Sequence, residues 1–191
     1  MSSFADETAE RLAVREPRIV PDLEVERRAA VTLVFKPAED GPHGLFVHRA
    51  EAEGDPWSGH MALPGGRADP DDADLIATAQ RELEEETGLT LPRDAFLGRL
   101  HDVWPRSREL PSIAVTPFVA WHEDPGEILP SVEVQGHIWI PLQALGDPLH
   151  RSELRLEVRG EVRVFPTIEY HDYTIWGLTL SIVDGFLRLT A

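Results

Sequence analysis

Residues 65–89 read GGRADPDDADLIATAQRELEEETGL, a stretch rich in acidic side chains that begins at two glycines. Within it, residues 73–87 carry apolar side chains at helical spacing, and the glycine that follows is a typical helix stop. At about 100° per residue, with Glu82 taken as zero, the apolar positions fall between about 20° and 120°. These positions are Leu75, Ile76, Ala79 and Leu83. The stretch therefore predicts a helix with one buried stripe.

The glutamates of this helix gather beside the apolar stripe. Glu82, Glu86 and Glu85 fall at about 0°, 40° and 300°, whereas Glu84 lies near 200°. Like charges spaced i,i+4, as at Glu82 and Glu86, destabilise a bare helix by a few tenths of a kcal/mol, so a compensating cation is expected. Mg²⁺ takes oxygen ligands and is commonly held by a few carboxylates together with substrate phosphates. Arg81, at about 260°, is placed to hold Glu85.

Composition narrows the class of protein further. The chain has 191 residues, of which 42% are hydrophobic, enough for one domain with its own core. It has no cysteine, which excludes disulfides, a thiolate nucleophile and cysteine-ligated zinc or iron–sulfur sites. A net charge of −16 with scattered arginines argues against nucleic acid as a partner. An anionic small molecule remains compatible with the charge, because divalent cations can neutralise both site and ligand.

The sequence also predicts a cytoplasmic protein with no membrane partner. A membrane-spanning helix needs about 18 or more apolar residues, and the best candidate, Ile175 to Leu187, is interrupted by Asp184 and Gly185. The first residues, MSSFADETAERL, are acidic and lack the apolar centre of a signal peptide.

The rest of the chain alternates short β-rich runs with turn signals. Residues 1–25 are expected to form an appendage with a short helix, and residues 26–191 the main domain. The expected strands are 29–36 and 44–50, as an antiparallel pair, then 97–104, 112–122 and 136–142. The remaining predictions are a loop over 51–72, a hairpin over 153–165 turning at Arg159-Gly160, and a helix over 174–189. This order predicts an α/β (α+β) sandwich, a mixed sheet with helices on its faces.

The acidic helix and its glycines closely resemble the Nudix box, the signature of hydrolases that cleave a diphosphate linked to another moiety. The matching residues are Gly66, Asp72, Arg81-Glu82-Leu83, Glu85-Glu86 and Gly88-Leu89. Two features depart from the general pattern: Asp72 stands where glutamate is usual, and eight residues rather than seven separate it from Arg81. The resemblance implies a Nudix-like mixed sheet flanked by helices.

Within that family the chain resembles the coenzyme A diphosphatase branch. The expanded box, with Asp69 and Asp72 after the glycines, is one point of similarity. Residues 45–49, with Gly59 and residues 63–66, resemble the upstream motif of that branch, and residues 175–179 resemble the start of its C-terminal helix. The upstream motif here lacks its second arginine and has Leu63 where an aromatic residue is usual.

The resemblance implies a set of site residues and a cofactor. Glu82, Glu86 and Glu85, with the carbonyl of Gly65, would hold Mg²⁺ or Mn²⁺ against a diphosphate. The general base would be Glu85 or Glu133, with Arg81 orienting the carboxylates, and the sequence leaves this choice open. Arg49 and Arg67, with Gly66, would bind substrate phosphates, because arginine binds phosphate in bidentate fashion. With coenzyme A as substrate, the products would be 3′,5′-ADP and 4′-phosphopantetheine.

Other interpretations stand beside this one. The substrate could instead be ADP-ribose, a nucleotide sugar or another nucleoside diphosphate derivative, and a non-catalytic Nudix ligand sensor is a third possibility. Arg49 and Arg67 could equally be surface ion pairs, and Trp139 and Trp176 could be core residues or substrate stackers. The aspartates at 69–74 do not form a calcium loop of the EF-hand type, because Asp74 and Gln80 occupy the positions that need glycine and glutamate.

Overall fold

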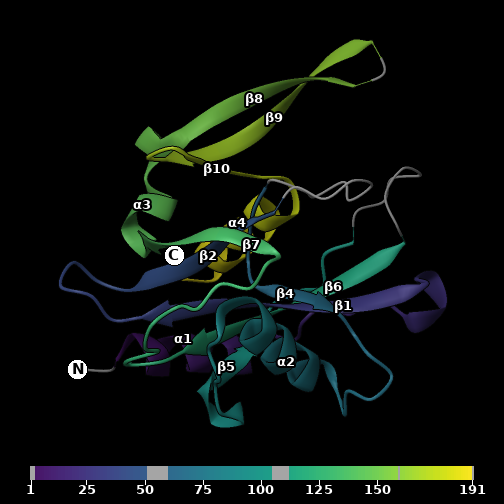
Figure 1. Ribbon diagram of the computed structural model, residues 1–191, viewed down its shortest axis with the longest axis vertical. Coiled ribbons are helices and arrows are strands. Elements are labelled where there is room, and N and C mark those ends of the chain that lie inside the picture. Colours follow the sequence, from purple (N-terminus) through teal and green to yellow (C-terminus); the bar gives the residue numbers. More distant parts are fainter. Residues whose placement is uncertain (1–2, 51–59, 105–111, 159, 191) are drawn as a thin grey trace.

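Two β-sheets and four α-helices make up the part of the chain that the computed structural model describes, residues 3–50, 60–104, 112–158 and 160–190 (Figure 1). The helices are α1 (Phe4–Ala13), α2 (Leu75–Thr87), α3 (Leu142–Gly146) and α4 (Gly177–Thr190), with short 3₁₀ turns at Asp22–Glu24, Arg93–Ala95 and Pro148–His150. The strands are β1 (Arg27–Lys36), β2 (His43–Arg49), β3 (Met61–Ala62), β4 (Gly65–Arg67), β5 (Phe96–Arg99), β6 (Ile113–Trp121), β7 (Val134–Pro141), β8 (Arg151–Val158), β9 (Glu161–Tyr170) and β10 (Tyr173–Trp176).

Strand β1 lies at the centre of the larger sheet. The order is β3-β2-β1-β6-β5, with β4 paired to β1 and β7 paired to β2. β1 and β6 run parallel along the whole of β6, with Ala30 opposite Thr116, whereas β1 and β2 are antiparallel, with Phe35 opposite Gly44. The predicted mixed sheet and its antiparallel pair are therefore confirmed.

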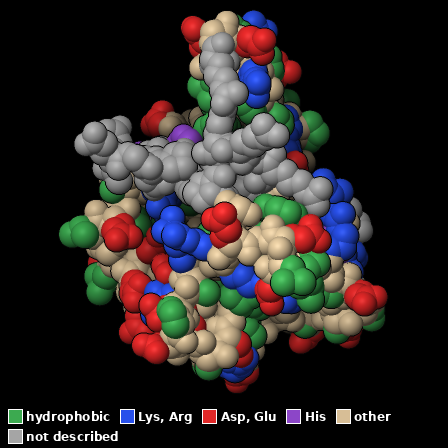
Figure 2. All heavy atoms as spheres, turned by 90° about the vertical axis from the view of Figure 1, so that its right-hand side faces the viewer, with side chains coloured by type: hydrophobic (Ala, Val, Ile, Leu, Met, Phe, Trp, Pro, Cys, Tyr) green, Lys and Arg blue, Asp and Glu red, His purple; other side chains and the backbone are tan. Residues whose placement is uncertain are grey.

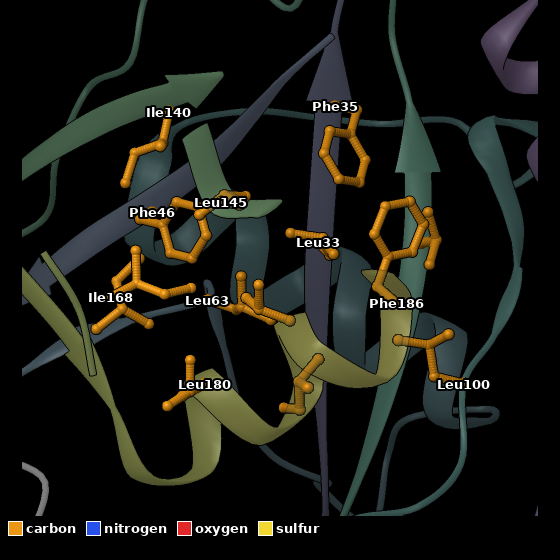
Figure 3. Close-up of a cluster of buried hydrophobic side chains, with 14 of the residues drawn as sticks. Leu33, Phe35, Phe46, Leu63, Leu100, Ile140, Leu145, Ile168, Leu180 and Phe186 are labelled. Atoms are coloured by element: carbon orange, nitrogen blue, oxygen red, sulfur yellow. The ribbon is translucent and has the colours of Figure 1, made fainter. Parts of the chain in front are cut away.

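Helices cover both faces of this sheet. Successive residues of a strand point to opposite faces, and β1 is buried on both. Phe35 points toward α4, where its ring lies 4.9 Å from that of Phe186 (Figure 3), and Val34 points to the opposite face, where it packs with Leu83 of α2. The larger core in Figure 3 also includes Leu33, Phe46, Leu63, Leu100, Ile140, Leu145, Ile168 and Leu180. The structure is thus the predicted sandwich of helices and sheet.

Helix α1 forms as predicted, but it contributes to the core of the domain. Its first turn is closed by a capping box between Ser3 and Asp6. The ring of Phe4 lies 5.3 Å from that of Phe35, and Leu12 is only 6% exposed. Residues 1–25, expected to be an appendage, therefore include a helix that shares the main core. The spacing of apolar residues in a short helix shows which of its faces is apolar, but it does not show which part of the domain that face will pack against.

A buried carboxylate also ties the N-terminal segment to the sheet. The side chain of Asp102 has no exposed surface. It accepts hydrogen bonds from the backbone N–H of Val20 at 2.9 Å and the hydroxyl of Thr116 at 2.8 Å. Arg28 and Arg99 form ion pairs with it at 3.2 and 2.5 Å. Burial alone would raise the pKa of Asp102, but the hydrogen bonds and Arg99 outweigh burial and lower it.

Asp102→Asn is expected to lower the free energy of unfolding at neutral pH by about 1–3 kcal/mol, because an amide replaces a charged acceptor. A carboxyl whose pKa is lowered by folding adds stability above its unfolded pKa of about 3.9, and that stability is lost as the pH falls below this value. The difference between wild type and variant should therefore shrink in acid. Chemical denaturation at pH 7 and pH 3 measures it, and an equal difference at both would contradict the assignment.

Three predicted elements differ in the structure. The loop predicted for 51–72 contains β3 and β4, which are too short to show periodicity; residues 51–59 lie outside the described part. The strand predicted for 97–104 is wrong beyond Arg99, where only a single bridge joins Val103 to Val115. The helix predicted from Thr174 begins at Gly177, because residues 173–176 pair with β9 as β10.

The predicted hairpin is confirmed and is longer than expected, since β8 and β9 pair from Arg151–Ile168 to Val158–Glu161. Gly160 takes φ of 78° at its turn, a conformation that favours glycine. Among the described helices, none combines the length and apolar character required to cross a membrane.

Candidate active site

Helix α2 is capped at both ends, and its packing on the sheet determines which way its glutamate side chains point. The carboxylate of Asp74 accepts hydrogen bonds from the N–H groups of Ile76 and Ala77 at 3.0 and 2.9 Å, and Gly88 closes the C-terminus with φ of 73°. The helix packs on the sheet through Ala79 and Leu83, both fully buried. The sequence thus holds the acidic face of α2 against the edge where β4 joins β1.

Glu86 is the most deeply buried of the acidic side chains on α2, with 4% of its surface exposed. Its Oε2 accepts a hydrogen bond from the backbone N–H of Gly65 at 2.9 Å, and its Oε1 lies 3.6 Å from a guanidinium nitrogen of Arg49. Burial raises the pKa of Glu86 to about 7, against the opposing effects of these two groups. The Gly65 N–H and Arg49 therefore offset only part of the energetic cost of burying the charged form of Glu86.

Glu82 lies one turn earlier and faces Gly66. Its side chain is 16% exposed and pairs with Arg81 at 2.8 Å. Burial raises the pKa of Glu82 and outweighs the effect of Arg81. A β-carbon on Gly66 would approach Oε1 of Glu82 to 2.6 Å, well inside normal contact. Only glycine at this position leaves the Glu82 carboxylate where it is.

Arg81 connects the loop after β4 to the helix. It binds Asp72 in bidentate fashion, with Nε–Oδ1 and Nη2–Oδ2 distances of 3.1 and 3.0 Å, and it donates to the carbonyl of Arg67 at 2.9 Å. It also pairs with Glu85 at 3.1 Å, the contact predicted from their spacing. The hydrogen bonds from Arg81 hold the pKa of Asp72 well below its usual range. Arg81 therefore positions its neighbours.

A cleft of about 1140 Å³ opens beside these residues. Its charged end includes Arg49, Glu82, Glu86 and Glu133, the residue immediately before β7. The negative charge of Glu133 adds to burial in raising the pKa of both Glu82 and Glu86. The predicted residues Gly65, Gly66 and Arg67 also line the cleft. Glu85 and Arg81 do not, and the Glu85 side chain is 58% exposed on the outer side of α2.

The other wall of the cleft is apolar and was not predicted as a set. Its members include Val31, Met61, Leu63, Val103, Trp104, Phe165, Trp176 and Leu178. β10 and the start of α4 bring Trp176 to this wall, where its ring lies 4.7 Å from His60 and 5.5 Å from Phe165. Trp139, in contrast, packs in the core beneath α2, with the amine of Lys36 over its ring. The sequence indicated part of this wall through the motif at residues 175–179, which contains Trp176 and Leu178. Gly59, from the upstream motif, lies outside the described residues.

The charged end fits a hard divalent cation in part. The buried carboxylate of Glu86, the partly buried carboxylate of Glu82 and the space beside Gly66 suit oxygen coordination. Among residues 3–50, 60–104, 112–158 and 160–190, however, no three acidic or histidine side chains converge closely enough to enclose an ion. An ion held there would therefore need oxygens from water or a bound phosphate. This is how Mg²⁺ is usually bound, through one or two carboxylates together with substrate phosphates.

Comparisons with known proteins agree with this architecture. At 33% identity over 171 residues, the chain is similar to "Nudix hydrolase 15, mitochondrial" of Arabidopsis thaliana, covering 85% of this chain and 58% of that protein. It is 29% identical over 168 residues to "Mitochondrial coenzyme A diphosphatase NUDT8" of Homo sapiens, covering 85% and 69% of the two chains. The chain thus spans little more than half of the Arabidopsis relative.

Solved structures share the fold at low identity. A MutT/nudix family protein from Enterococcus faecalis superposes with a TM-score of 0.60 at 16% identity, covering 100% of this chain and 75% of that one. The MutT protein of Methanosarcina mazei gives a TM-score of 0.55 at 20% identity, covering 86% of this chain and 92% of that one.

Residues 26–159 match the NUDIX domain, the span that carries α2, Gly65, Gly66 and Glu133. This chain belongs to the Nudix family.

Proposed function

We propose that this chain hydrolyses the diphosphate bond of coenzyme A or acyl-coenzyme A, using Mg²⁺ or Mn²⁺, to 3′,5′-ADP and 4′-phosphopantetheine or its acylated form. The observation that carries the proposal is the two-part cleft. One end presents Glu82, Glu86 and Arg49, and the rest is an apolar wall that includes Trp176 and Leu178. Coenzyme A has the same division, with a diphosphate between a nucleotide and a long uncharged arm. The name of the human relative points the same way.

In this proposal Glu82 and Glu86 hold the metal, with the carbonyl of Gly65 as a further ligand. A divalent cation supplies charge stabilisation on the phosphate oxygens and a template for the attacking water. The burial of Glu86 and its contact with the Gly65 N–H fix one oxygen, so the carboxylate is held in place before substrate arrives. Asp72 and Arg81 support this arrangement by fixing the loop after β4.

Glu133 is the better placed of the two candidate bases. It lines the cleft at the charged end, and the N–H of Ala50 binds its backbone carbonyl at 2.8 Å, which anchors that end of β7 to the chain after β2. Glu85 instead points outward and is bound to Arg81. A carboxylate within reach of the water takes its proton. Arg49 and Arg67, both on the cleft, are proposed to bind the substrate phosphates.

A substrate panel tests the proposal directly. Wild type is incubated with Mg²⁺ or Mn²⁺ and each of coenzyme A, acetyl-coenzyme A, ADP-ribose and a nucleotide sugar, and products are identified by mass spectrometry. The expected result is release of 4′-phosphopantetheine or its acetylated form, and no turnover when EDTA is present. Cleavage of ADP-ribose or the nucleotide sugar alone would retain diphosphate hydrolysis and reject coenzyme A. No turnover of any substrate would favour the ligand-sensor interpretation.

A further inference from the structure

The outer strand of the β8–β9 hairpin carries a pattern of alternating charge. The smaller sheet has the order β10-β9-β8, so within the described residues one edge of β8 is left without a partner strand. The hairpin projects away from the rest of the chain in Figure 1, with β8 on its outer side. Along β8, Arg151, Glu153, Arg155 and Glu157 alternate in sign on one face. Arg151 pairs with Asp184 of α4 at 2.8 Å, whereas Glu153, Arg155 and Glu157 form no ion pair with any described residue.

The two faces of the hairpin differ in polarity. The register places Leu154 opposite Phe165 on one face, and Phe165 in turn packs on Trp176 at the cleft. On the other face Arg155 lies opposite Val164, which is 49% exposed. A projecting two-stranded ribbon with exposed apolar residues is marginally stable unless another strand or surface supports it. Its open edge is the natural place for such support.

We infer that β8 pairs in antiparallel fashion with β8 of a second copy of this chain, about a two-fold axis through Leu154. This register sets Glu153 of each copy opposite Arg155 of the other, and Arg151 opposite Glu157. Every cross-strand pair on that face then joins opposite charges, an arrangement that stabilises neighbouring strands. On the reverse face the two Leu154 side chains meet between the two Phe165 rings, so that one apolar row crosses four strands.

Charge complementarity selects a second copy as the occupant. The chain carries a net charge of −16, which opposes contact between most parts of two identical molecules. Figure 2 shows acidic and basic side chains interspersed on the described surface, and the hairpin at the top of that view carries both. The strip on β8 is locally neutral and self-complementary under two-fold rotation, as an isologous contact requires. Like charges along an edge would prevent such pairing, whereas alternating charges permit it in one register.

Charge reversal at the two central positions tests the register. Arg155→Glu and Glu153→Arg each place like charges opposite one another twice, and each is expected to weaken self-association at least about tenfold. The double variant Glu153→Arg/Arg155→Glu restores both pairs and should self-associate like wild type. An equimolar mixture of the two single variants should form heterodimers for the same reason. Sedimentation velocity over a range of protein concentrations at low salt measures all four cases.

Arg163→Glu is the matched control for Arg155→Glu, because it makes the same change in net charge on β9, away from the open edge of β8. It is expected to leave self-association unchanged. A wild type that stays monomeric across the concentration range would overturn the inference, as would a dimer that is insensitive to the single reversals or is not restored by the double variant. None of these outcomes depends on which substrate the cleft accepts.

Discussion

Glu86→Gln is expected to lower kcat/KM for diphosphate hydrolysis by about 1000-fold or more, because a metal ion contributes several kcal/mol of charge stabilisation. The fold should be retained or slightly stabilised. The amide oxygen of glutamine can still accept the hydrogen bond from the Gly65 N–H. The variant also removes the cost of burying a charged carboxylate, a cost that already raises the pKa of Glu86 to about 7. Loss of activity with an unchanged or higher Tm would show that Glu86 serves the reaction and does not stabilise the fold.

Glu84→Gln is the control for this experiment. It makes the same chemical change on the same helix, at an exposed position on the far side from the cleft. Its kcat/KM and Tm should match those of wild type. Metal binding by the two variants, measured by calorimetry with Mn²⁺ and a non-hydrolysable diphosphate, separates the proposed role from a general effect on the helix. Equal activity of Glu86→Gln and wild type would remove Glu86 from the proposed site.

Gly65→Ala is expected to lower the free energy of unfolding by about 3 kcal/mol or more, or Tm by about 6–12 °C for a chain of this length. Gly65 has φ of 149°, a conformation that side chains rarely adopt. A β-carbon there would meet the carbonyl oxygen of Ala30 and approach Cα of Val31 to 2.5 Å. Both obstacles are backbone atoms of the central strand β1, which cannot move aside cheaply. Thermal unfolding followed by circular dichroism measures the change.

The neighbouring substitution Gly66→Ala should behave in the opposite way. The atoms nearest to its β-carbon belong to the carboxylate of Glu82, the far end of a flexible side chain, so stability should change little. The carboxylate must move, however, and activity should fall with it. The two variants add one methyl group at adjacent positions, which makes each the control for the other. A Gly66→Ala protein with full activity would show that the position of Glu82 is not critical.

Local patterns in the sequence determined the helix that carries the site. The 3.6-residue period over Leu75–Leu83, the cap at Asp74 and the stop at Gly88 are all interactions within a few residues, so they can be read without the fold. The same holds for the β8–β9 hairpin, whose turn is set by Gly160. The order of the expected strands and helices predicted the mixed sheet with helices on its faces, and the family resemblance implied the same arrangement. The structure and the comparisons confirm it.

Only the tertiary structure decided which carboxylates share the cleft. Periodicity grouped Glu85 with Glu82 and Glu86, but Arg81 draws Glu85 to the outer side, and β7 brings Glu133 in from 47 positions beyond Glu86 in the chain. Such contacts depend on how strands pair across the sheet, which no local repeat encodes. The same is true of α1, whose Phe4 joins a core built from distant strands, and of the apolar wall around Trp176. The sequence by itself thus specified the acidic helix and its chemistry, and long-range packing specified the shape of the cleft around it.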